Sequence, residues 1–347
     1  MCGLEPVTHF LTAACFSRAG LNRTTGLATL TLVLTAEAPD ADVLAFFGGS
    51  VTGFAQHRGF THTLLGAPVV AGVVVLGVYG IYRVMARRGW KPKLPPRWKL
   101  LFLYALLMCL VHIFQDFTND YGVRPFAPFY PRWFSWDIVS IIDPIMLLAL
   151  FLGLVVPWIF GLISEEVGAG KNQFRGRGGA IFALSCLAAV ILVRHIEHRR
   201  AVNALDSITY RGEEPIRVSA FPHALNPFAW TGVVETAGSF ELAPVDSWSG
   251  HVDAQNRAVV LFKPEETAVT LAAKQSRLGR FYLDWAGYPL VSTERLPNNA
   301  GYRVRFQDLR FASVKTLSQQ TAAPLRGYVE LDPQLRVTDQ FMGEPSR

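Results

Sequence analysis

Residues 64–82, LLGAPVVAGVVVLGVYGIY, decide the fold class of this chain, because these 19 residues carry no charge. A second uncharged stretch, residues 144–164, is 21 residues long. A helix needs about 20 apolar residues to cross the hydrocarbon core of a membrane. Both stretches therefore predict transmembrane helices.

Four further apolar stretches precede residue 195. Residues 100–115 and 178–193 each run for 16 uncharged residues, and the second ends at Arg194, whose long side chain can reach the membrane surface. We interpret both as spanning helices. Residues 6–17 and 24–36 are apolar but shorter. The basic turn between them predicts a tight helical hairpin.

The rest of the chain has a different pattern. Tyr302, Val304 and Phe306 alternate with arginines, and residues 258–262 form a short apolar run. Alternation with a period of two is typical of β-strands. We therefore predict a membrane all-α domain over residues 1–198, with about six helices of which the first two are short. A small β-rich soluble domain follows over residues 199–347.

The basic residues predict the orientation in the membrane. The net charge is +6, but seven Lys and Arg residues lie in the single loop 83–99, so topology explains them better than nucleic-acid binding does. With that loop in the cytoplasm, alternation places the turn 18–23 and the loop 164–177 inside. The inner segments then hold twelve Lys and Arg residues, and the outer segments 39–61 and 116–137 hold three. Both termini are expected outside, although basic residues follow the last helix there.

Ionisable side chains gather at the outer helix ends under this topology. Such groups are costly at membrane depth unless they are paired, metal-bound or facing water. The candidates come from four segments: His9; Asp40 and Asp42; His57 and His62; His112 and Asp116. Imidazoles with carboxylates suit Zn²⁺ or another divalent transition metal, and seven candidates are enough for two or three ions.

Each candidate also has an ordinary structural alternative. His112 and Asp116 share a helix face at i and i+4, which suits a shared metal but also a solvated helix end. His57 and His62 are five residues apart, too far for one straight helical face, so His57 is expected in a loop or cap. Asp40 and Asp42 would serve as a helix-capping turn and His9 as a core histidine. Their convergence on one face favours the metal site.

The motifs that carry these residues are PVTH (6–9), PDAD (39–42), HRGFTH (57–62) and HIFQDFTNDYG (112–122), followed by Trp136-Asp137 and Asp143-Pro144. With them the sequence resembles the YdjM-type family of predicted inner-membrane metal-dependent hydrolases. The motif order is also similar to zinc-dependent phospholipase C. The resemblance implies a multi-pass protein of the bacterial inner membrane. Asp120 stands where relatives are expected to have Asn, so its role as a ligand or as a support for a ligand stays open.

The predicted function is hydrolysis of an ester or phosphoester by metal-activated water, with the site and the C-terminal domain on the outer side. Asp40 or Asp42 would accept a proton, and Arg58 would either grip a phosphate or pair with Asp116 or Asp120. Asp143 would hold a histidine or cap a helix, and the second role is favoured. Aromatic residues over 126–136 predict an interfacial belt.

A site at the membrane surface suggests a lipid or lipid-linked substrate, and no nucleic acid. The oligomeric state is open. Two other classes compete with the hydrolase: a metal-binding transporter, which would place its ligands near the membrane midplane, and a non-catalytic membrane protein with a structural metal site.

Overall fold

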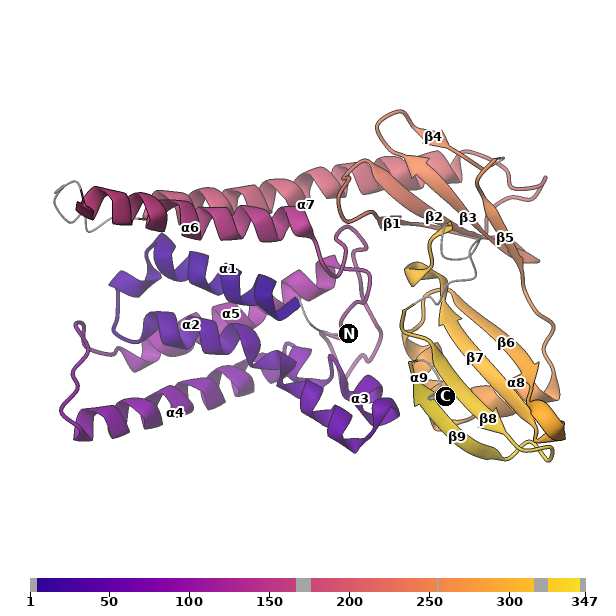
Figure 1. Ribbon diagram of the computed structural model, residues 1–347, viewed down its shortest axis with the longest axis horizontal. Coiled ribbons are helices and arrows are strands. Elements are labelled where there is room, and N and C mark those ends of the chain that lie inside the picture. The colour runs from indigo at the N-terminus through magenta and orange to yellow at the C-terminus, as the bar shows by residue number, and fades with distance from the viewer. Residues whose placement is uncertain (1–4, 167–175, 255, 315–323, 344–347) are drawn as a thin grey trace. The chain divides into compact units, whose positions relative to one another are not determined.

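The computed structural model describes residues 5–166, 176–254, 256–314 and 324–343 (Figure 1). The chain forms two compact units. The first contains Met1–Asp42 and Arg58–Arg194, and the second contains Val43–His57 and His195–Arg347. Helices fill the N-terminal part and antiparallel sheets follow in the C-terminal part, so the predicted fold class is confirmed. The predicted inner loop 164–177 lies largely outside the described residues.

The first unit is a helix bundle. Among the described residues α4, α5 and α7 are long and apolar enough to cross a membrane, and α2 and residues 144–160 of α6 are shorter apolar helices. The predicted hairpin of two short helices corresponds to α1 and α2. The helices are α1 (Glu5–Ala19), α2 (Ala28–Glu37), α4 (Gly66–Arg87), α5 (Trp98–Thr118), α6 (Pro144–Glu166) and α7 (Arg177–Asp206), the last continuing into the second unit.

Small side chains let these helices approach closely. Ala67 and Ala71 of α4 lie fully buried against Ala105 and Cys109 of α5, and each pair is four residues apart on one helix face. Small residues at such spacing are typical of helix packing in membranes, where dispersion contacts between backbones replace the hydrophobic effect. Helix α5 also packs against α2, and α1 packs against α2 and α6 (Figure 1). This packing brings the end of α2, the start of α4 and the end of α5 close to one another.

The second unit contains two antiparallel sheets. The predicted strand around residue 304 lies in β7, and the predicted apolar run 258–262 lies mainly in β5. The first sheet has the order β1 (Arg217–Pro222), β2 (Ala229–Glu235), β3 (Ser239–Asp246), β4 (His251–Val252), with β5 (Val259–Phe262) also paired to β3. The second has the order β6 (Pro289–Arg295), β7 (Tyr302–Asp308), β8 (Gly327–Leu331), β9 (Val337–Met342).

The described residues of this unit also form the short α-helices α3 (Ser50–Gln56), α8 (Ala268–Lys274) and α9 (Arg277–Trp285). Helix α3 comes from the N-terminal part of the sequence but packs within the second unit. The Phe54 ring lies edge-on to Trp285 with ring centres 5.2 Å apart, and Ser50 Oγ accepts a hydrogen bond from the Met342 N–H at 3.1 Å. The chain therefore leaves the first unit after Asp42 and returns to it at Arg58.

Candidate metal centre

Three segments of the first unit supply a cluster of metal-ligand side chains. Asp40 follows α2 in the short 3-10 segment Pro39–Gly48, and His62 ends the 3-10 turn Phe60–His62 just before α4. His112 and Asp116 lie in the last two turns of α5. One donor atom from each of these residues lies within 4.8 Å of the others. We call Asp40, His62, His112 and Asp116 the four-residue cluster.

The separations that join the two histidines to each other and to the two carboxylates are close to the edges of a tetrahedral site. His62 Nε2 lies 3.1 Å from His112 Nε2 and 3.3 Å from both Asp40 Oδ1 and Asp116 Oδ2. His112 Nε2 lies 3.6 Å from Asp40 Oδ1 and 3.4 Å from Asp116 Oδ2. A tetrahedron with metal bonds of about 2.0–2.1 Å has edges of about 3.3–3.4 Å. The donor set of two imidazoles and two carboxylates therefore fits one divalent ion.

Hydrogen bonds at the far side of each imidazole orient its ring. His112 Nδ1 lies 2.7 Å from the carbonyl oxygen of Ala36, which can only accept, so Nδ1 carries the proton. His62 Nδ1 lies 3.3 Å from Asp42 Oδ2, and a carboxylate there likewise favours the proton on Nδ1. In both neutral rings the Nε2 lone pair then points into the cluster, as in histidines that bind a metal. Asp42 is a support for His62 in this geometry.

The electrostatics of the cluster favour a positive charge at its centre. Burial alone would lower the pKa of His62, but hydrogen bonds to Asp116, Asp40 and Asp42 outweigh burial and raise that pKa well above 6.5. Burial alone would raise the pKa of Asp40, yet hydrogen bonds from His112 and His62 hold it well below its usual range. Converging lone pairs and carboxylates repel one another unless a proton or a metal ion lies between them.

His9 lies on the other side of Asp116. Its Nδ1 is 3.1 Å from Gln115 Oε1, whose amide nitrogen in turn donates to Thr12 Oγ1 at 3.0 Å. The proton therefore belongs on His9 Nδ1. His9 Nε2 is buried and lies 3.4 Å from Asp116 Oδ1, and it has no hydrogen-bond partner in the part of the chain that the structure describes. Asp116 thus faces the four-residue cluster with one oxygen and His9 with the other.

A water-sized cavity of about 30 Å³ adjoins His9 and Asp116. Its remaining lining comes from α1, α5, α6 and the segment before α6: Thr8, Gln115, Thr118, Asn119, Val139, Ser140, Ile141, Asp143 and Met146. A polar cavity of this size is large enough for one water molecule. The geometry therefore provides room for a water or a second ion next to His9.

Arg58 is buried and holds the C-terminal end of α5. Its Nη2 donates to Asp116 Oδ1 at 3.0 Å, and its Nη1 donates to Asn119 Oδ1 at 3.0 Å and to the Gly122 carbonyl at 2.9 Å. Its backbone N–H donates to Asp42 Oδ2 at 2.7 Å. Of the two roles considered for Arg58, this geometry favours the ion pair with Asp116.

The other candidates lie elsewhere. His57 belongs to the second unit and is not part of the four-residue cluster. Asp120 lies in the bend after α5. Asp143 Oδ1 accepts the N–H groups of Ile145 and Met146, both at 3.0 Å, and its Oδ2 lies 2.7 Å from Arg194 Nη2. Asp143 therefore caps α6 and pairs with α7.

The sequence did not predict three groups that support the site: the Gln115 and Asn119 side chains and the Ala36 carbonyl. Gln115 and Asn119 lie inside the motif 112–122, but their amides were not assigned a role. Asn119 Oδ1 accepts the N–H groups of Tyr121 and Gly122, at 3.0 and 3.3 Å, in addition to Arg58. The position of Gln115 three residues after His112 would have placed it near the same helix face. The Ala36 carbonyl carries no sequence signal at all.

The fold and the site define a multi-pass helical membrane protein with a buried His/Asp group at its helix ends. Residues 4–201, more than half of the chain, match the family described as YdjM inner membrane protein, and the chain belongs to that family. A relative from Bacillus subtilis (strain 168), described as "Uncharacterized protein YfhP", is 27% identical over 282 residues, which cover 80% of this chain and 75% of that protein. No solved structure matches.

Proposed function

We propose that this protein is a membrane-bound metal-dependent hydrolase that cleaves an ester or phosphoester bond of a lipid or lipid-linked substrate. The main support for this proposal is the near-tetrahedral spacing of the four-residue cluster, with His9 and a water-sized cavity beside Asp116. Zn²⁺ is the favoured ion, because it accepts mixed imidazole and carboxylate ligands in tetrahedral geometry. The cavity leaves room for a second ion.

A divalent ion bound by these residues would lower the pKa of a water molecule towards about 7 and so supply hydroxide at neutral pH. His9 is placed to receive the proton, because its Nε2 faces Asp116 and the cavity while Gln115 holds its Nδ1. Arg58 fixes the Asp116 carboxylate through Oδ1. The protein's own groups would thus orient the water and accept its proton.

Asp40 marks the side from which a substrate would enter. Its side chain is 21% exposed, whereas those of His62 and Asp116 are at most 2% exposed. A ligand at the rim of a site can move or exchange more readily than a fully buried one. We therefore assign Asp40 to the substrate side of the centre, and Asp42, which is 8% exposed, to support of His62.

The surroundings favour a substrate from the membrane. His62 precedes α4 by four residues and Asp116 lies two residues before the end of α5, so the centre lies at the ends of two candidate spans. Phe60, Leu64 and Leu65, next to His62, are about half exposed. Exposed apolar side chains at a helix end suit the boundary between headgroups and acyl chains. We place this face on the outer side of the inner membrane.

A structural metal site is the second candidate, and one observation favours it. Four protein ligands complete a tetrahedral shell, which is typical of structural zinc, whereas catalytic zinc keeps one position open. In that role the ion would join the ends of α2, α4 and α5. A transport role has less support, because the ligands lie at helix ends and a transporter holds its ions near the midplane.

His9 separates the hydrolase from the structural site. We would purify the parent, His9→Ala and His112→Ala in mild detergent, with exposed His251→Ala as the control, and measure bound metal and hydrolysis of phospholipids and generic phosphoesters. The hydrolase hypothesis predicts that His112→Ala loses metal and activity. His9→Ala should keep the ion of the four-residue cluster but lose at least tenfold in activity, as expected for a general base.

These measurements distinguish the hydrolase from the structural metal site. A parent that binds metal and hydrolyses none of the substrates, with His9→Ala behaving like the parent, would support the structural site instead. A parent without any transition metal after gentle purification would refute both candidates.

A further inference from the structure

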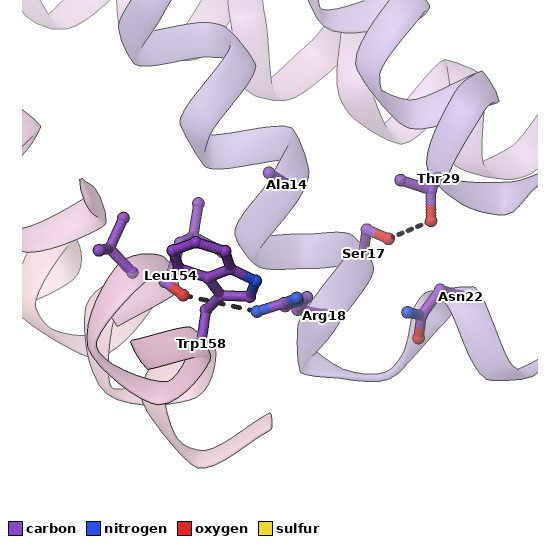
Figure 2. Close-up of a pocket in the computed structure, with 8 residues that line it drawn as sticks. Ala14, Ser17, Arg18, Asn22, Thr29, Leu154 and Trp158 are labelled. Atoms are coloured by element: carbon purple, nitrogen blue, oxygen red, sulfur yellow. Dashed lines mark hydrogen bonds between the residues drawn. The ribbon is translucent and has the colours of Figure 1, made fainter. Parts of the chain in front are cut away.

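The first unit has a second cavity, of about 310 Å³, that shares no residue with the metal centre. It lies between the C-terminal end of α1, the turn after it, the start of α2 and the middle of α6. Figure 2 shows Arg18 of α1 reaching towards Leu154 and Trp158 of α6. The lining residues are Ala14, Ser17, Arg18, Asn22, Thr29, Leu154, Val155 and Trp158.

The cavity is remote from the metal centre. Arg18 follows His9 by nine residues on the same helix, which corresponds to about 13.5 Å along the axis. His9 lies near the start of α1 and Arg18 in its last turn. The cavity therefore lies towards the opposite ends of the helices, and its occupant would not touch the four-residue cluster.

Arg18 is the cation of this cavity. Its Nη1 donates to the Leu154 carbonyl at a long 3.4 Å, and Arg18 forms no ion pair with the carboxylates whose side chains the structure describes. Arg177, the neighbouring cation, already donates from Nε to the Ala19 carbonyl at 3.0 Å and so caps α1. Arg18 therefore has hydrogen-bonding capacity for an anion.

The lining around Arg18 is apolar. Leu154, Val155 and Ala14 form it, and Trp158, 54% exposed, lies at its edge. The hydroxyl groups of Ser17 and Thr29 form a 2.7 Å hydrogen bond with each other, so neither needs a polar ligand as a partner. Tryptophan and arginine side chains together are typical of the headgroup level of a membrane. The cavity thus combines one positive charge with an apolar surface that an acyl chain could cover.

We propose that this cavity binds one anionic phospholipid, with its phosphate on Arg18 and an acyl chain along Leu154, Val155 and Trp158. The single cation selects an anionic headgroup over a zwitterionic one. The apolar lining selects a lipid over free phosphate, because a phosphate alone would leave that lining in contact with water. The bound lipid would join α1 and α6 at the end away from the metal centre.

Native mass spectrometry of the full-length protein in detergent tests this site. The ligands would be phosphatidylglycerol, phosphatidylcholine and glycerol phosphate, and the variants Arg18→Gln and Ala14→Phe, with exposed Arg88→Gln as the matched control. We expect phosphatidylglycerol to bind the parent and Arg88→Gln alike, and Arg18→Gln about fivefold more weakly, the effect of one basic residue at a lipid surface. Ala14→Phe fills the cavity and should also weaken binding.

Three results would overturn the proposal: equal binding of phosphatidylglycerol to the parent and Arg18→Gln, equal binding of phosphatidylcholine and phosphatidylglycerol to the parent, or displacement of the lipid by equimolar glycerol phosphate. The last result would identify a phosphate site instead. If Arg18→Gln does not fold, Ala14→Phe decides alone, since it keeps the charge, and undiminished lipid binding there would refute the site. Metal content should be unchanged in every variant.

Discussion

At the scale of single residues, Asp116 connects every part of the centre. One of its oxygens faces His62 and His112, and the other lies between His9 and Arg58. Asp116 and Arg58 are both almost completely buried. A buried arginine needs its carboxylate, because an uncompensated charge at this depth is costly.

Asp116→Asn should therefore lose the metal and destabilise the protein together. The amide keeps the side-chain shape but leaves Arg58 without its carboxylate, so we expect a loss of about 3–5 kcal/mol in the free energy of unfolding. Metal content and thermal unfolding in detergent would measure both effects. Asp339→Asn, on an exposed strand position, is the control. A stable variant that keeps its metal would contradict the assigned role.

The pKa of His62 gives a pH dependence. In the metal-free protein this pKa is raised above 6.5, so its protonated form stabilises the fold below that pH, and the contribution is lost as pH rises through the raised value. A metal ion must displace the proton. The difference in Tm between metal-loaded and chelator-treated protein should thus be larger at pH 8 than at pH 6. An equal or smaller difference at pH 8 would contradict this expectation.

The sequence predicted the members of the four-residue cluster because each lies in a motif with a chemically unusual side chain near a helix end. It did not predict which ones meet. His57 and His62 share a motif, yet they belong to different units. The pairing of Asp143 with Arg194 joins residues 51 positions apart through the packing of α6 and α7, and no local pattern reports such a contact.

At the scale of elements, the turn that carries His62 depends on Gly66. A Cβ added at Gly66 would lie 2.0 Å from the Phe60 carbonyl oxygen. The Gly66 N–H also donates a hydrogen bond to Thr63 Oγ1 at 2.8 Å. Only glycine lets the Phe60–His62 turn fold back onto the start of α4. The metal ligand is therefore positioned by a residue that touches no metal.

Gly66→Ala should displace the turn and weaken metal binding at least tenfold, with Gly72→Ala as its matched control. Nothing lies within 4 Å of a Cβ added at Gly72 in the same helix, so that substitution should be neutral or stabilise by about 0.5–1 kcal/mol through helix propensity. Metal titration followed by thermal unfolding would compare the two variants. Equal metal affinity in both would show that the turn tolerates displacement.

The long apolar helices were predictable from composition, and the short helices of the second unit were not. Helix α9 has a strongly one-sided apolar pattern and begins after Ser276, whose side chain accepts the Gly279 N–H, while Thr267 caps α8. These capping signals were present in the sequence. Helix α3 has no such cap, and its place in the second unit depends on Phe54 packing against Trp285.

At the scale of the whole molecule, α7 links the membrane part to the sheets. It is a single helix of 30 residues, about 45 Å long, which exceeds the hydrocarbon thickness of about 30 Å. Its C-terminal part packs with the first sheet, where Leu205 and Trp230 share a core, and Glu197 Oε2 accepts a hydrogen bond from Ser247 at 2.8 Å. Helix α7 therefore belongs to both units, and its residues from His195 onward form part of the core of the second.

This continuity bears on the predicted orientation, in which the C-terminus lies outside. The basic residues after the last apolar stretch opposed that orientation. Arg194 is buried and pairs with Asp143 at 2.7 Å, and Arg200 pairs with Glu197 at 2.8 Å, so both belong to folded structure and not to a short loop. Charges within long domains influence orientation little. The twelve-to-three excess of Lys and Arg in the predicted inner segments therefore still predicts an outer C-terminus.

Two reporter fusions test the orientation. Alkaline phosphatase fused after Arg347 should be active and green fluorescent protein at that site dark, because only the former matures outside the cytoplasm. Fusions truncated after Gly89, in the basic connection between α4 and α5, should give the opposite pair of signals. Reversal of both pairs would invert the topology and place the metal centre at the cytoplasmic face. The same pair at both sites would mean that the number of spans between residues 89 and 347 is even, which contradicts three crossings by α5, α6 and α7.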